Sequence, residues 1–279
     1  MSLFSGVIHW EDPGADQTIE EDMMKLTVLG SGTCIPLPNR NAPGYFLQAG
    51  GLHILVDCGS GVARQLAKAG YSCETLDCIL LTHLHPDHCS DLVAIVHALK
   101  IATEGRRKKR LTIGGPAAIG EYYRSCVGEW VGAVSFPVKL VDMQRPIDFD
   151  GVRIDCHASG HLDNGQSKSY RFTCEDKVIV FTGDAPYSRE LAAFATCADL
   201  VVADCSTLDK DRRAGHMSAG QCGVLAREAG AQAVMLSHLY PDAFPDQARV
   251  DECRREFAGE IVLAEDLMEY EVGRPVVGE

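Results

Sequence analysis

The segment from Thr82 to His88 concentrates side chains that can bind a metal ion. It reads Thr-His-Leu-His-Pro-Asp-His and places three imidazoles and a carboxylate within six residues. Protonated histidines this close together would repel each other, whereas neutral ring nitrogens bind zinc at about 2.0–2.1 Å. A polar loop that is rich in histidine by chance is the ordinary alternative. Residues further along the chain favour the metal site.

Three further candidate ligands lie at or after the ends of strand-like segments. Asp184 ends KVIVFTGD, His238 ends AVMLSH, and His161 follows the alternating segment VRIDCHASG. Each alone has a plainer interpretation, as a turn aspartate or a hydrogen-bonded surface histidine. With the motif they supply seven nitrogen and oxygen ligands, enough for two metal ions bridged by one carboxylate. The seven are His83, His85, Asp87, His88, His161, Asp184 and His238.

The elements that must position these groups alternate between strands and helices. In the first half the pattern predicts a strand in KLTVLG, a hairpin in GYFLQAGGLHILVDCG, a buried strand in LDCILLTH and helices in GVARQLAKAG and DLVAIVHALKIA. In the second half it predicts strands in GVRIDCHASG, ADLVVADC, AVMLSH and EIVLAED, a hairpin in SYRFTCEDKVIVFTGD and a helix in AGQCGVLAREAG. We therefore expect one α/β domain with mixed sheets over residues 25–279, after an acidic extension over residues 1–24.

Composition limits the partners of the chain. The formal net charge is −13, so the average surface repels nucleic acid and anionic membranes. The run Arg106–Arg110 is a local exception, and a solvated loop or helix end is favoured over a phosphate-binding patch. No apolar run approaches the roughly 20 residues that cross a bilayer. The N-terminus lacks the features of a signal peptide, which favours the cytoplasm.

The twelve cysteines do not follow a zinc or disulfide pattern. They are scattered singly, and no Cys-x-x-Cys occurs. In a chain without a secretion signal we expect them to be reduced, small, buried hydrophobic residues.

The motif and its flanking landmarks resemble a known family. HLHPDH resembles the HxHxDH signature of the metallo-β-lactamase superfamily, and VLGSGT, ILVDCG, FTGD and LSHL match its other landmarks in order. The resemblance implies a four-layer αββα sandwich with its metals at the edge where the two sheets open. It assigns His83, His85 and His161 to one ion. It assigns Asp87, His88 and His238 to the other, with Asp184 as the bridge.

Two positions near the motif have competing interpretations. His157 is an alternative to His161 as third ligand, and the short loop before SKSYRF favours His161 by resemblance. Asp57 in ILVDCG resembles an acidic residue that orients a metal-bound histidine. A plain aspartate in a turn at a strand end is equally compatible with Asp57.

One more histidine points to a branch of the family. Gly215-His216-Met217-Ser218 resembles an element of ribonuclease Z and its phosphodiesterase relatives, in which the histidine faces the scissile phosphate. His216 also begins a helical segment, whose N-terminal N–H groups favour an anion. A capping or surface histidine is the alternative. Asp87, Asp184 and His216 are accordingly the predicted catalytic residues.

These features predict a hydrolase with two divalent ions, Zn²⁺ first and Mn²⁺ or Fe²⁺ as alternatives. Two such ions lower the pKa of a bridging water and stabilise developing negative charge. A small phosphodiester is the favoured substrate, because the stretch between His161 and Asp184 is too short for the RNA-gripping arm of tRNA-processing relatives. The alternatives are a carboxyl-ester, lactone or thioester hydrolase, a ribonuclease Z-like tRNA endonuclease, and a non-catalytic metal-binding or partner-binding protein. A homodimer is compatible with this prediction.

Overall fold

A computed structural model of the chain describes residues 24–241 and 245–273. The acidic extension expected over residues 1–24 therefore lies outside the described residues, apart from Met24. Its boundary with the domain stays a prediction.

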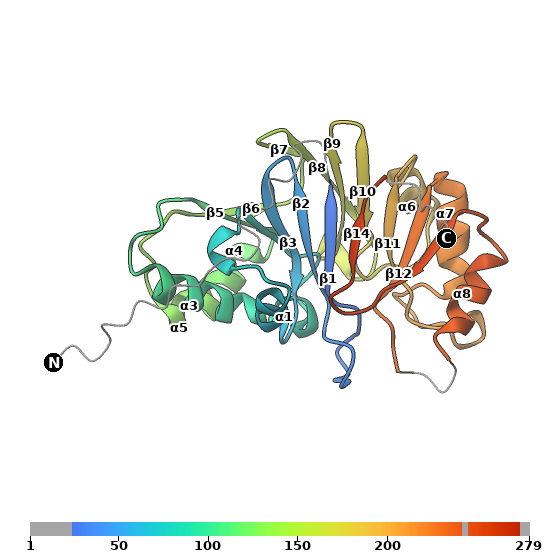
Figure 1. Cartoon of the computed structure of the whole chain (residues 1–279), viewed down its shortest axis with the longest axis horizontal. Helices are drawn as coiled ribbons and strands as arrows, with labels where there is room; N and C mark the ends of the chain where they lie inside the picture. The colour runs from blue at the N-terminus through green and yellow to red at the C-terminus, as the bar shows by residue number, and fades with distance from the viewer. Residues whose placement is uncertain (1–23, 242–244, 274–279) are drawn as a thin grey trace.

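Two seven-stranded mixed sheets form the centre of the described structure (Figure 1). The first has the order β14-β1-β2-β3-β4-β5-β6. Its strands are β1 (Lys25–Gly30), β2 (Gly44–Ala49), β3 (Leu52–Cys58), β4 (Cys78–Leu80), β5 (Leu111–Gly115), β6 (Val138–Asp142) and β14 (Glu269–Glu271). The second has the order β13-β12-β11-β10-β9-β8-β7. Its strands are β7 (Ile147–Phe149), β8 (Val152–Ala158), β9 (Lys168–Cys174), β10 (Lys177–Phe181), β11 (Leu200–Asp204), β12 (Ala233–Ser237) and β13 (Glu260–Leu263).

Helices cover the outer face of each sheet (Figure 1). Those in the first half of the chain are α1 (Val62–Lys68), α2 (Pro86–Cys89), α3 (Asp91–Thr103), α4 (Ile119–Tyr122) and α5 (Glu129–Val131). Those in the second half are α6 (Arg189–Phe194), α7 (Ala219–Ala229) and α8 (Gln247–Arg254). None of these described helices is long and apolar enough to span a membrane.

Three apolar clusters hold the layers together, and strand alternation explains them. In β3, Ile54 and Val56 point between the sheets, whereas Leu55 points toward the helices of the first half. In β12, Met235 lies between the sheets and Val234 packs with the helices of the second half. Because successive side chains of a strand face opposite ways, strands that are apolar on both faces are buried on both faces. The result is the expected αββα sandwich.

The strand predicted over residues 76–83 is shorter than expected. Only Cys78–Leu80 is extended as β4. Beyond it the backbone N–H of Thr82 donates to the Asp57 carboxylate at 2.7 Å instead of continuing a ladder. The chain therefore turns before His83 and frees the motif from the sheet.

The helix after His216 begins at a capping box. The Ser218 hydroxyl accepts from the backbone N–H of Gln221, and the Gln221 side chain accepts from the backbone N–H of Ser218. These bonds satisfy N–H groups that a helix start otherwise leaves without partners. The start of α7 is thereby fixed, and with it the position of His216.

All twelve cysteines are free, and seven of them are buried. Cys34 and Cys197 are exposed. The expectation that the cysteines are buried hydrophobic residues therefore holds for only part of the set.

Candidate metal centre

Every candidate ligand lies near the end of a strand at one edge of the sandwich. Strands β10, β11 and β12 are parallel neighbours, so their carboxyl ends lie together. Asp184 follows β10, and His238 follows β12. Strands β3 and β4 are also parallel, and the motif His83–His88 follows β4. The carboxyl edge of parallel strands is the common place for sites in α/β proteins.

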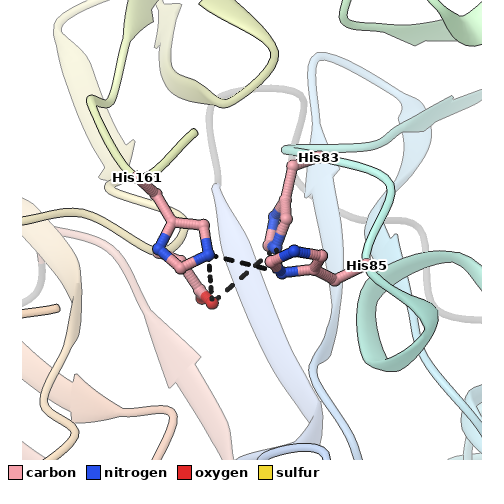
Figure 2. Close-up of side chains that lie close together, drawn as sticks. His83, His85 and His161 are labelled. Carbon is pink, nitrogen blue, oxygen red and sulfur yellow. Dashed lines mark hydrogen bonds and ion pairs between the residues drawn. The ribbon is translucent and has the colours of Figure 1, made fainter. Parts of the chain in front are cut away.

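Three histidines form the first group. His83 Nε2 lies 2.9 Å from His85 Nδ1, and His161 Nε2 lies 3.3 Å from the same nitrogen. Figure 2 shows the three rings directing these nitrogens toward one another. Nitrogens that share a tetrahedral zinc at about 2.0–2.1 Å would lie about 3.3 Å apart. The spacing of the three rings therefore fits one ion.

Two histidines and an aspartate form the second group. Nε2 of His88 and Nε2 of His238 lie 3.6 and 3.7 Å from Oδ2 of Asp87. The same two nitrogens lie 3.3 and 3.4 Å from Oδ1 of Asp184. These two Nε2 atoms and Oδ1 of Asp184 are buried and have no hydrogen-bond partner among the described residues. An unsatisfied buried polar atom costs about 1–3 kcal/mol, so a shared cation would remove a cost that the fold otherwise carries.

Asp184 divides its two oxygens between the groups. Oδ2 lies 3.7 Å from Nε2 of His83 and 3.8 Å from Nε2 of His161, whereas Oδ1 faces His88 and His238. The carboxylate itself is buried. This arrangement fits a carboxylate that bridges two cations. The donors are imidazole nitrogens and carboxylate oxygens, which suit zinc, manganese or iron.

Three of these histidines have a polar partner at the ring nitrogen that faces away from the candidate centre. Nδ1 of His88 donates to Asp57 Oδ2 at 2.8 Å. The Thr82 hydroxyl donates to the same carboxylate at 2.8 Å and lies 3.1 Å from Nδ1 of His83. Nδ1 of His161 donates to the Gly215 carbonyl at 2.9 Å. Such contacts fix the ring orientation and the tautomer of a metal-binding histidine, so the interpretation of Asp57 as an orienting residue fits the geometry.

His216 stands beside the second group without joining the seven. Its ring stacks on that of His238, with centroids 5.4 Å apart and planes 12° apart. Its Nδ1 donates to Asp204 Oδ2 at 2.8 Å. Oδ1 of Asp204 lies 3.4 Å from Nδ1 of His238. One buried carboxylate thus orients both histidines.

Asp204 was missed by the sequence reasoning. It ends ADLVVAD, a strand that runs parallel between β10 and β12. The available signal was an aspartate at the carboxyl end of an apolar strand, the same position that singled out Asp184.

The structure separates the two candidates for the third histidine. His157 lies on β8 and stacks on Phe194, with ring centroids 5.3 Å apart. His161 lies beyond the strand end and contacts His85 and Asp184. The geometry therefore favours His161.

Burial and charge give the two groups different protonation. Burial, with the neighbouring His88, lowers the pKa of His83 to about 2, and burial also lowers the pKa of His85. Burial acts the same way on His238, but the Asp184 carboxylate outweighs it and raises its pKa to about 10. Burial would also raise the pKa of Asp184, yet His238 and His88 hold it well below its usual range. His83 and His85 are therefore neutral donors, whereas a cation beside His238 would displace a proton.

The basic run is partly structural. The Arg107 side chain is buried, donates to the carbonyls of Glu74 and Leu76, and lies over the Phe136 ring. Lys109 forms an ion pair with Asp77 at 2.7 Å. The run is therefore in part a brace between the end of α3 and the segment before β4. The expectation of a solvated segment is wrong for Arg107, which is buried, and holds for the other four residues, which are exposed.

Comparison with known proteins identifies the family. A family model described as the beta-lactamase superfamily domain matches residues 53–239, which is more than half of the chain. The chain belongs to the metallo-β-lactamase superfamily. Within it, the chain is 29% identical to ribonuclease Z of Thermoplasma volcanium, covering 89% of this chain and 97% of that protein. It is also 29% identical to YhfI of Bacillus subtilis, named a probable metallo-hydrolase, covering 86% and 97%.

Solved structures agree with this assignment. The crystal structure of YhfI superposes with a TM-score of 0.78 at 28% identity, covering 90% of this chain and 99% of that one. The short form of human tRNase Z has a TM-score of 0.70 at 20% identity, covering 90% and 100%, and shows the fold alone. The relatives and the histidine–aspartate clusters together support a metal-dependent hydrolase that uses divalent ions.

Proposed function

We propose that this superfamily member holds two divalent ions, zinc in the first instance, and hydrolyses a small phosphodiester. His83, His85 and His161 would hold one ion, and Asp87, His88 and His238 the other, with Asp184 between them. The observation that carries the substrate class is His216. It lies against the second group, and its Nδ1 is held by Asp204 at 2.8 Å.

Bound at this edge, two divalent ions would supply hydroxide at neutral pH and stabilise the negative charge that develops on the phosphate oxygens. The residues of the chain would do the rest. Because Asp204 occupies Nδ1 of His216, Nε2 remains for the substrate. That nitrogen would donate a proton to the leaving oxygen or hold a phosphate oxygen. Asp87 and Asp184 would fix the positions of both ions.

The relatives also support a second candidate, a tRNA endonuclease, because several of them are named ribonuclease Z. Two features favour the small substrate. Strands β9 and β10 are joined at Glu175 and Asp176, with Cys174 directly opposite Lys177, so this hairpin carries no arm. The net charge is −13, and two residues of the basic run already have partners in the protein: Lys109 pairs with Asp77, and Arg107 donates to the Leu76 carbonyl. Long polyanions therefore have little to bind.

A substrate panel tests the proposal. Protein loaded with zinc or manganese is incubated with bis(p-nitrophenyl) phosphate, p-nitrophenyl acetate, a lactone and a precursor tRNA. We expect diester cleavage to exceed that of the acetate and the lactone. Proteins with 6–10 phosphate contacts lose about 10³–10⁵-fold in affinity between 50 and 200 mM salt. Efficient cutting of the tRNA with such a salt dependence would overturn the choice of a small substrate, and preference for the lactone would overturn the phosphodiester assignment.

A further inference from the structure

The Tyr240 side chain contacts residues of three loops beside the candidate centre. Its ring centroid lies 5.7 Å from that of His238 and 6.0 Å from that of His216, both edge-on. Its hydroxyl lies 3.9 Å from the thiol of Cys34, in the loop after β1. The guanidinium of Arg213 packs over the Tyr240 ring as a cation–π contact, with its central carbon 4.4 Å from the ring centroid. Tyr240 therefore belongs to the wall of the site, and Arg213 extends that wall outward.

Among the basic side chains of residues 210–213, that of Arg213 has no carboxylate partner among the described residues. Its neighbour Arg212 pairs with Asp209 at 3.0 Å, and Lys210 pairs with Asp211 at 3.8 Å. Arg213 is exposed and makes no ion pair with any described residue. Among the described residues of this chain of net charge −13, Arg213 is therefore an exposed cation beside the candidate centre that can receive an anionic group of a substrate.

The loop that carries Arg213 is fixed to the site. The backbone N–H of His216 donates to the Arg213 carbonyl at 3.3 Å, and the Gly215 carbonyl accepts from Nδ1 of His161. Gly215 has φ +81°, and a Cβ there would lie 2.8 Å from Nδ1 of His161. The backbone of this loop is therefore held by its own turn and by one histidine of the first group, His161. Because its position is set in advance, less entropy is lost when Arg213 binds a ligand.

We propose that Arg213 determines substrate specificity, by binding a second anionic group of the substrate next to the scissile phosphodiester. This inference rests on the proposed function and names its substrate class: a diester that carries a further phosphate or carboxylate. No hydrogen bond or ion pair joins Arg213 to the seven candidate ligands, which are all described, so it serves a flanking group. The Tyr240 face keeps the guanidinium plane in place, while its N–H groups stay free to bind an anion in bidentate fashion.

A matched pair of substrates tests this assignment. Thymidine 5′-(p-nitrophenyl phosphate) has the scissile diester alone, and its 3′-phosphorylated form adds one anionic group with the same leaving group. The variants are Arg213→Ala, Arg213→Lys and the control Arg212→Ala, whose side chain is equally exposed but paired with Asp209. We expect the wild type to have the lower KM for the 3′-phosphorylated form. Hydrogen bonds to charged groups correspond to about 10- to 100-fold in affinity, so Arg213→Ala should remove that preference by about this factor.

A binding measurement separates this inference from the proposed function. Calorimetry with thymidine 3′,5′-bisphosphate needs no turnover. We expect the Kd of Arg213→Ala to be higher than that of the wild type by about 10-fold or more. The Kd of Arg213→Lys should lie between the two, and that of Arg212→Ala should equal the wild-type value. Arg213-dependent binding without any diester cleavage would refute the proposed function and keep Arg213 as an anion-binding residue. Equal binding by wild type and Arg213→Ala would overturn the inference. So would an equal loss on both substrates, or a wild type without preference for the 3′-phosphate.

Discussion

Nδ1 of His88 lies 2.8 Å from Oδ2 of Asp57, although the two residues are 31 positions apart in the chain. Both side chains are buried. The contact turns Nε2 of His88 toward Asp87 and Asp184, where that atom has no hydrogen-bond partner among the described residues. Asp57 thereby connects the end of β3 to the metal centre without being a ligand.

Replacing Asp57 should weaken metal binding. Loss of a residue that orients a metal-bound histidine reduces metal affinity by about 10–100-fold. We expect Asp57→Ala to show this loss for one of the two ions in a competition titration with a chromophoric chelator. Asp57→Asn retains one acceptor oxygen and should lose less. Zinc affinity unchanged in both variants would show that the contact is only structural.

Asp184 and His216 should differ in their effect on turnover. Asp184→Ala removes the carboxylate shared by both groups and should abolish both metal retention and activity. His216→Ala should keep the metal content and lose about 10²–10⁴-fold in diester turnover, the usual contribution of a general acid or base. Metal analysis and kcat at saturating metal distinguish the two. Full diester activity in His216→Ala would remove the best support for a phosphodiesterase.

Metal removal should lower thermal stability. The buried atoms Nε2 of His88, Nε2 of His238 and Oδ1 of Asp184 have no hydrogen-bond partner among the described residues, and a bound cation would contact all three. A ligand at 1,000 times its Kd stabilises a fold by about 4 kcal/mol. We expect a clear fall in Tm after treatment with a chelator, its recovery with zinc, and two ions per chain by elemental analysis. A stoichiometry of one ion or fewer after reloading would contradict the binuclear centre.

Two glycines with the same backbone conformation allow a matched comparison. Gly215 and Gly230 have φ of +81° and +61°, but only at Gly215 would a Cβ approach another residue, at 2.8 Å from Nδ1 of His161. Both Gly→Ala variants should lose about 1 kcal/mol of stability through backbone strain. Gly215→Ala should in addition lose metal affinity, because His161 must move. Equal metal affinity in the two variants would show that His161 is not needed at its observed position.

The basic run should affect stability more than substrate binding. Arg107→Ala removes the hydrogen bonds to the carbonyls of Glu74 and Leu76, which should cost about 2–3 kcal/mol in urea unfolding. Arg106 has an exposed side chain, so Arg106→Ala should change stability by less than about 0.5 kcal/mol. Reduced diester turnover in well-folded Arg106→Ala would instead assign the run to the substrate.

Hydrophobic patterning predicted most of the strands, because strands such as β3 and β12 are apolar on both faces and form continuous apolar runs. It missed β14, where Glu269–Glu271 pairs with β1 as a short polar edge strand. It also extended β4 through Leu81 and Thr82, because an apolar run does not reveal that the Asp57 carboxylate accepts the Thr82 N–H and ends the ladder.

The seven candidate ligands could be listed from spacing and family resemblance, since a dense motif and three residues at strand ends are visible in one dimension. Asp204 and Tyr240 could not be identified from the sequence in this way. Asp204 has no distinguishing neighbour in sequence, and its importance comes from the two histidines that it contacts. Tyr240 depends on a stacking contact with Arg213, 27 positions away.

The division of the chain between the two sheets has a consequence for its synthesis. Strands β1 to β6 form the first sheet with β14, and β7 to β13 form the second. The candidate ligands divide the same way, with His83, His85, Asp87 and His88 in the first half and His161, Asp184 and His238 in the second. A nascent chain therefore completes the first group only after His161 and Asp184 have left the ribosome, and the second group only after His238, beyond β12, has followed. Capture of the second ion should therefore be a late event of co-translational folding, and each ion would connect the two halves of the chain.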